Sequence, residues 1–302
     1  MAKKQEPDRK LTELKVIPKF ESGRQETFPA EILNAVVPIL TRDPDSEVAA
    51  EYASGTAFCI ASFESGEALF VTAAHTIEHL QEPRPNMEPF LLFPMGMNST
   101  EEAQQLHAIR IRSISRTDLN TDIALLAIDN TTAVHPVEQF VHWTLDMDRL
   151  VEDEVVRGYG YGSVPHFKWY VPEEHTRSIH SPLLGATGPV TDVHSQNPGT
   201  NKLLSFPLFV FDAKTDHGMS GGPVVDEAGN VRGVISNGDT SAALIAGLID
   251  AQIDLRMTAD GEMHLVSIKE LVDQGHIRVV GKSKSISIER SEDTAQVTWE
   301  ED

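Results

Sequence analysis

Cysteine is almost absent from this sequence. Its 302 residues include a single cysteine, Cys59, so no intramolecular disulfide can form. Disulfides persist in oxidising compartments and are rare in the cytosol. Residues 1–6 also lack the apolar core of a secretory signal. Because Cys59 lies in an apolar, strand-like run, we interpret it as a buried small side chain rather than a reactive thiol. Together these features predict a cytoplasmic protein.

Long apolar runs and positive charge are also scarce. The longest apolar runs, 32–40 and 242–249, are shorter than the roughly 20 residues that a membrane-spanning helix needs. Lysine and arginine number 25 against 46 aspartates and glutamates, so the formal net charge is 25 − 46 = −21. Nucleic acids and anionic membrane surfaces select basic proteins. We therefore expect neither as a partner.

Short apolar runs separated by turn residues are abundant. The 20 glycines and 17 prolines are spread between these runs, a pattern typical of an all-β chain. One group of strand-like runs lies between residues 35 and 128, and a second follows a polar connector at 130–153. Each group fits a small antiparallel barrel. We predict an all-β fold of two antiparallel six-stranded β-barrels, with a C-terminal helix and an appended hairpin.

The chain is accordingly divided into four segments. They are a charged N-terminal arm at 1–27, a first barrel at 28–150, a second barrel with the C-terminal helix at 151–276, and an extension at 277–302. Ser267 and Glu270 match a capping box, which predicts a helix over 267–275. The extension is predicted to form a β-hairpin with an acidic end.

Three short motifs contain the residue types of a nucleophilic hydrolase. Residues 218–223, Gly-Met-Ser-Gly-Gly-Pro, hold Ser220 in a turn of small residues before an apolar strand. His75 ends one strand-like run, and Asp122 opens another. The gaps are 122 − 75 = 47 and 220 − 122 = 98 residues. A serine hydroxyl is a weak nucleophile that needs a histidine base, and the base needs a carboxylate to orient it.

With these motifs the chain resembles the trypsin-like (chymotrypsin-fold) serine proteases, in their cytosolic and HtrA-like branch. Segments 55–58, 158–160 and 211–236 also match that family in order and spacing. The resemblance implies an active site in the cleft between the barrels. His75 and Asp122 then come from the first barrel and Ser220 from the second. HtrA-like relatives often continue into a PDZ module, for which residues 277–302 are too few.

The resemblance also implies a role for each residue. His75 takes the proton of Ser220, Asp122 orients His75, and the backbone N–H groups of Gly218 and Ser220 form the oxyanion hole. The expected substrate is a protein or peptide, which is cut through an acyl-enzyme without a cofactor.

Five residues are predicted to contact the substrate: Lys214, Thr215, His217, Ser236 and Gly238. In the resembled family, the residue six before the serine lies at the base of the primary pocket, where trypsin has an aspartate. Here it is Lys214, which favours an acidic residue before the cleaved bond. The alternative is that Lys214 extends into solvent or pairs with a neighbouring aspartate, leaving a small apolar pocket.

Activation by a newly cleaved N-terminus, as in secreted relatives, is not expected for this sequence. Met219 occupies the position where those relatives carry an aspartate that binds a newly cleaved N-terminus. Loop ordering, an activating partner or the terminal arms remain as alternatives. We expect a gated site or a narrow range of substrates.

Two other functions are open to the same residues. His75 to His79 also read His-x-x-Glu-His, the signature of inverted zinc proteases. That motif requires a long helix, whereas the run before His75 has a β pattern, so no metal is expected. The second alternative is a catalytically silent pseudoprotease that serves as a peptide-binding module.

Overall fold

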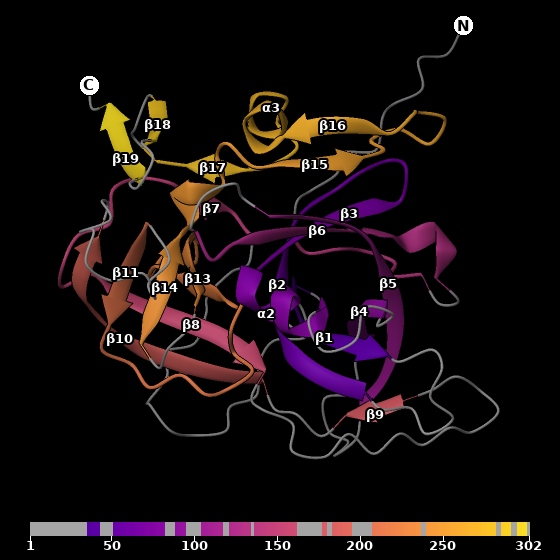
Figure 1. Ribbon diagram of the computed structural model, residues 1–302, viewed down its shortest axis with the longest axis horizontal. Coiled ribbons are helices and arrows are strands. Elements are labelled where there is room, and N and C mark those ends of the chain that lie inside the picture. The colour runs from indigo at the N-terminus through magenta and orange to yellow at the C-terminus, as the bar shows by residue number, and fades with distance from the viewer. Residues whose placement is uncertain are drawn as a thin grey trace, which may run out of the picture.

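Two closed antiparallel β-barrels of six strands each make up most of the computed structural model (Figure 1). It describes residues 35–42, 51–81, 88–94, 104–116, 121–133, 136–161, 177–179, 183–194, 207–236, 240–281, 285–290 and 295–300. The predicted arm at 1–27 and the predicted substrate residue Gly238 lie outside this part of the chain. The predicted fold class is confirmed.

The first barrel contains β1 (Val36–Arg42), β2 (Glu51–Ser62), β3 (Glu67–Thr72), β4 (Glu88–Pro94), β5 (Gln104–Arg116) and β6 (Ala124–Asp129). Their order is β4-β1-β2-β3-β6-β5, and pairing of β4 with β5 closes the ring. Successive residues of a strand face opposite sides. Phe70 accordingly packs inside this barrel, while Leu69 and Val71 face a second apolar cluster. Because both faces of β3 are buried, its residues 68–71 are all apolar.

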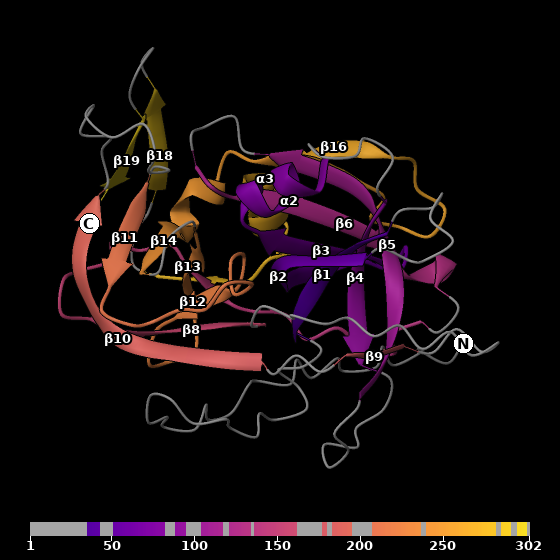
Figure 2. The same ribbon diagram turned by 60° about the horizontal axis from the view of Figure 1, so that its bottom comes forward.

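The second barrel contains β8 (Val155–Tyr161), β10 (Leu183–His194), β11 (Leu208–Phe211), β12 (Pro223–Val225), β13 (Val231–Ile235) and β14 (Ser241–Leu244). Their order is β12-β8-β10-β11-β14-β13, and β12 pairs with β13 to close it. Phe209, Phe211 and Ile235 fill its interior. The turned view of Figure 2 shows the two barrels again side by side.

The apolar cluster that Leu69 and Val71 face joins the two barrels. It combines Phe58 and Val71 of the first barrel with Tyr159 and Val234 of the second. Trp143, in the connector between them, stacks on Tyr159 with ring centroids 6.3 Å apart, and its indole N–H donates to the Ala35 carbonyl at 3.2 Å. Burial of large aromatic side chains is worth a few kcal/mol each. This cluster therefore fixes the barrels against each other.

Shorter elements surround the barrels. They are α2 (Ala74–Gln81), η1 (Asn130–Thr132), β7 (Leu145–Asp146), β9 (Arg177–Ile179), η2 (Ile245–Leu248), β15 (Gln252–Leu255), β16 (His264–Ser267), α3 (Ile268–Asp273), β17 (Val279–Val280), β18 (Ser285–Arg290) and β19 (Ala295–Glu300). Within the described residues, no helix is long and apolar enough to cross a membrane.

The C-terminal elements include a helix and a hairpin. The Ser267 hydroxyl accepts from the Glu270 amide at 3.1 Å, so the helix begins at the predicted cap. Strands β18 and β19 form an antiparallel hairpin within the extension, whereas β17 pairs with β7 beside the second barrel. The Trp299 indole N–H donates to the Met147 carbonyl at 2.7 Å and attaches this hairpin to the rest of the molecule.

One apolar run behaves differently from a single barrel strand. Residues 243–253 divide into the end of β14, the short helix η2 and the start of β15. Strand β15 pairs with β16 in a separate hairpin instead of continuing the second barrel. Figure 1 shows this hairpin and α3 over the same end of the molecule. An apolar sequence pattern predicts that a strand is buried, but it does not predict which sheet the strand joins.

The surroundings of Cys59 predict an inert thiol. The side chain is 0% exposed inside the first barrel, and burial raises the pKa of the thiol more than its hydrogen bond to the Ala61 carbonyl lowers it. The reactive thiolate is therefore disfavoured. We expect no maleimide labelling of the folded protein at about pH 8, and full labelling after unfolding in guanidinium, both read by mass spectrometry. Rapid labelling of the folded protein would contradict this account.

Candidate active site

The ends of two neighbouring strands bring His75 and Asp122 together. Strand β3 ends at Thr72, which pairs with Ala124 at the start of β6. His75 lies in the first turn of α2, directly after β3, and Asp122 lies just before β6. Residues 47 apart in sequence thus meet at one edge of the first barrel.

Both carboxylate oxygens of Asp122 bind His75. Ring atom Nδ1 of His75 lies 2.6 Å from Oδ2 of Asp122, and the His75 backbone N–H donates to Oδ1 at 2.8 Å. Two bonds to one residue fix both the position of the carboxylate and the orientation of the imidazole. With Nδ1 held in this way, Nε2 is the nitrogen left to exchange a proton with another group.

Asp122 is ionised although it is only 5% exposed. Burial by itself would raise the pKa of its carboxyl group. The hydrogen bond and the charge of His75, the hydroxyl of Ser236 and the His75 amide together outweigh burial, so the net pKa is lowered. The site therefore contains a buried negative charge at neutral pH.

Ser236 completes the surroundings of this carboxylate from the other barrel. Its hydroxyl donates to Oδ2 of Asp122 at 2.5 Å, and the residue directly follows β13 of the second barrel. The sequence analysis assigns Ser236 to the substrate-contacting set, and it does not predict this bond. No local pattern signals it, because the two residues are 114 positions apart.

The loop around Ser220 requires its glycines. Gly218 and Gly221 have φ angles of +96° and +87°, a region that residues with a Cβ atom rarely adopt. A Cβ on Gly221 would also lie 2.1 Å from the Thr56 carbonyl oxygen. The Gly221 amide donates to the Ile235 carbonyl at 2.8 Å, which ties the loop to β13.

Ser220 is held against the first barrel and is half-buried. Its carbonyl oxygen accepts from the Thr56 amide of β2 at 2.8 Å. Ser220 belongs to the second barrel in sequence, and this bond docks it on the barrel that carries His75 and Asp122. The loop of Ser220 is thus bonded to the barrel that carries the other two residues predicted as a triad.

The predicted substrate residues differ in exposure. Lys214 and His217 are exposed, whereas Thr215 is 6% exposed. The His217 amide donates to Oδ1 of Asp216 at 2.8 Å.

The described side chains do not favour the zinc interpretation. Helix α2 is 8 residues long. The carboxylate of Glu78 accepts from Arg116 at 2.7 Å, and the ring of His75 is bound to Asp122. Within the described residues, no three side chains of His, Cys, Asp or Glu are grouped as metal ligands; the side chain of His79 is outside that part.

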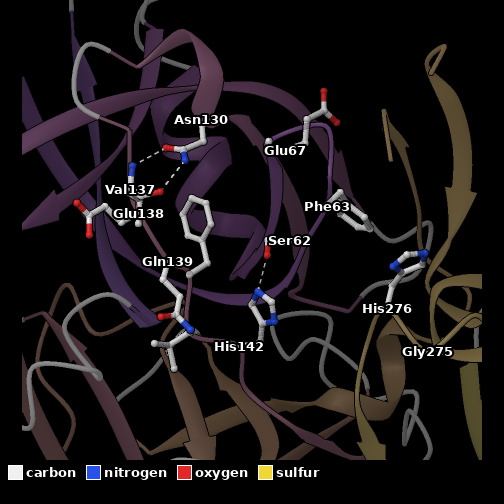
Figure 3. A pocket seen from close by; sticks show the side chains of 13 residues that line it. Ser62, Phe63, Glu67, Asn130, Val137, Glu138, Gln139, His142, Gly275 and His276 are labelled. Atoms are coloured by element: carbon white, nitrogen blue, oxygen red, sulfur yellow. Dashed lines mark hydrogen bonds between the residues drawn. The ribbon is translucent and has the colours of Figure 1, made fainter. Parts of the chain in front are cut away.

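A hydrogen-bonded pair of serine and histidine lines a cavity of about 690 Å³ away from this site (Figure 3). Nε2 of His142 lies 2.9 Å from the hydroxyl of Ser62, beside Phe140 and Val137. Burial lowers the pKa of His142 and so disfavours its imidazolium. This pair is therefore poorly suited to accept a proton.

The lowered pKa of Asp122 predicts a pH-dependent contribution to stability. A carboxyl group whose folded pKa is below the unfolded value stabilises the fold above that unfolded value, and the contribution disappears as the pH falls through the folded pKa. The ordinary value is 3.8. In urea unfolding between about pH 2.5 and pH 5, the advantage of wild type over Asp122→Asn should shrink towards the acid end. A constant difference in the free energy of unfolding over this range would refute it.

Comparisons with known proteins identify a family for this sequence. A family model described as a trypsin-like peptidase domain matches residues 55–234. No curated protein matches the sequence. The structure is similar to the crystal structure of Deg5, with a TM-score of 0.48 and 17% identity over 71% of this chain and 85% of that one. It is also similar to a variant of the HtrA-type protease AlgW with a decapeptide, with a TM-score of 0.46 and 15% identity over 85% of this chain and 69% of that one. Because the family model matches more than half of the sequence, the chain belongs to the trypsin-like peptidase family.

Proposed function

We propose that this protein is a serine endopeptidase that cuts peptide bonds through an acyl-enzyme on Ser220. The observation that carries the proposal is the 2.6 Å bond between His75 and the buried, ionised Asp122. It is supported by the bond from Thr56 to Ser220, which docks the serine on the same barrel. The family match supports a peptidase of this class.

The proposed reaction begins with attack of the Ser220 oxygen on the substrate carbonyl carbon. Its proton passes to Nε2 of His75, and Asp122 stabilises the imidazolium that forms. The N–H groups of Gly218 and Ser220 donate to the oxyanion of the tetrahedral intermediate. The C–N bond then breaks, the leaving amine takes the proton from His75, and an ester on Ser220 remains. Water, deprotonated by His75, hydrolyses this ester and restores the serine.

An intracellular setting and a restricted activity form part of the proposal. The lone, buried Cys59 suits a compartment without disulfides. Met219 is 1% exposed, and its sulfur lies 3.3 Å from the Asp216 amide. A buried thioether gives a new N-terminal amine no partner at this position, which favours loop ordering or an activating partner as the control.

A fluorophosphonate probe tests the proposed nucleophile. Wild type should be labelled, and Ser220→Ala should not. In peptide hydrolysis the loss should reach roughly four to six powers of ten, as for other catalytic triads. Ser62→Ala is the matched control, because Ser62 also pairs with a histidine, and its labelling should equal that of wild type. A zinc chelator should change nothing.

Each other outcome points elsewhere. Labelling that persists in Ser220→Ala and disappears in Ser62→Ala would move the nucleophile to Ser62. Loss of activity with the chelator would favour a metal site. Folded wild type without any labelling would favour the pseudoprotease. Rapid general digestion of casein by wild type would contradict the restricted activity.

Lys214 is proposed to select an acidic residue before the cleaved bond, with Thr215, His217, Ser236 and Gly238 completing the substrate-contacting set. Lys214 is exposed between the buried Ala213 and Thr215, which anchor its backbone. In a peptide-library profile, wild type should prefer Asp or Glu about fivefold, and Lys214→Ala should lose the preference, since one charge contact is worth about 1 kcal/mol. Lys269→Ala, an exposed lysine on α3, is the control. A profile without acidic preference that Lys214→Ala leaves unchanged would contradict this assignment.

A further inference from the structure

Thr56 is a fully buried polar residue between both barrels and the Ser220 loop. Its amide donates to the Ser220 carbonyl at 2.8 Å, and its hydroxyl donates to the Gly218 carbonyl at 2.9 Å. The same hydroxyl accepts from the amide of Tyr161, at the end of β8, at 2.9 Å. Its own carbonyl accepts from the Thr72 hydroxyl at 2.7 Å. Every hydrogen-bonding group of Thr56 therefore has a partner.

The surrounding chain is built to admit these contacts. A Cβ on Gly55 would lie 2.7 Å from the Ser220 carbonyl oxygen, so the position before Thr56 has no room for a side chain. Ala57, which follows, is buried and apolar. A hydroxyl at 0% exposure costs free energy unless its hydrogen bonds are made. At Thr56 they are made to two backbone groups from different segments, which is more than packing requires.

One of these bonds acts on the turn that precedes Ser220. The Gly218 carbonyl and the Met219 N–H belong to the same peptide plane. Thr56 holds the carbonyl, and the Asp216 carbonyl accepts from the Met219 N–H at 3.1 Å. Gly218 has a φ of +96° and no side chain, so rotation of the adjacent peptide planes meets little steric resistance. The bond from Thr56 supplies the restraint that a side chain would otherwise give.

We propose that Thr56 is a positioning residue whose hydroxyl holds the turn at 218–220 in the conformation in which the Gly218 and Ser220 N–H groups converge on one oxyanion. This inference rests on the proposed function, because it assigns Thr56 a part in the same reaction. Thr56 does not touch the reacting atoms; it acts through the loop that carries them.

The kinetic test compares Thr56→Val, Thr56→Ser and Ser65→Ala. Thr56→Val keeps the shape and removes the hydroxyl, whereas Thr56→Ser keeps the hydroxyl. Ser65 is the matched control, because its hydroxyl is also buried, donates to the carbonyl of Arg256 and accepts from the Glu67 amide, and it belongs to the first barrel away from the loop.

The measured quantity is fluorophosphonate labelling, divided into the affinity of the probe and the maximal labelling rate. Thr56→Val should lower the maximal rate about tenfold to hundredfold, less than the loss of an oxyanion donor itself, and change the affinity less than about twofold. Thr56→Ser should retain most of the rate. Ser65→Ala should lower the thermal midpoint without lowering the rate. Equal rates in Thr56→Val and Ser65→Ala would overturn the proposal.

A second measurement does not depend on activity. Hydrogen–deuterium exchange of a peptide covering 218–222 should speed up in Thr56→Val, and it should stay at the wild-type rate in Thr56→Ser and Ser65→Ala. If wild type reacts with no probe, the proposed function fails, and exchange still decides whether Thr56 holds the turn. Unchanged exchange in a folded Thr56→Val would overturn the role of Thr56 whatever the activity. If Thr56→Val does not fold, Thr56→Ala takes its place in both measurements.

Discussion

The buried charge of Asp122 is the constraint on which the candidate site depends. Removing a carboxylate from water costs several kcal/mol unless hydrogen bonds and opposite charge compensate for it. Here the compensation comes from both barrels: His75 supplies its ring and its amide, and Ser236 supplies a hydroxyl at 2.5 Å. The two barrels must therefore keep their relative position to within the tolerance of a hydrogen bond. Any movement that separated them would leave the charge uncompensated.

Apolar packing brings the barrels together, but it does not by itself set their relative orientation. The hydrophobic effect is non-directional, so the cluster around Trp143 and Tyr159 determines proximity and not orientation. Direction comes from polar contacts that cross the interface, chiefly those of Asp122 with Ser236 and of Thr56 with the Ser220 loop. Both sets are buried, and each would be costly if broken. Stability and the geometry of the site therefore rest on the same few bonds.

The parts of this arrangement that follow from local sequence were predictable. Short apolar runs between turns predict the two barrels, and the cap of Ser267 on the amide of Glu270 is a contact three residues apart. Three motifs in a family order predict His75, Asp122 and Ser220 as partners. The separate hairpin at β15–β16 and the bond from Ser236 to Asp122 were not predictable. Both depend on contacts between residues that are far apart in the sequence. Neither an apolar run nor a single serine indicates by itself which residue it contacts.

The same constraint distinguishes the surroundings of His75 from those of His142, the histidine that is hydrogen-bonded to Ser62. A histidine that takes a proton becomes a cation, so its surroundings must favour that charge. At His142 burial lowers the pKa of the imidazole and opposes the cation. At His75 the ring nitrogen lies 2.6 Å from a carboxylate that stays ionised despite its burial. The buried carboxylate that would stabilise an imidazolium therefore distinguishes His75 from His142.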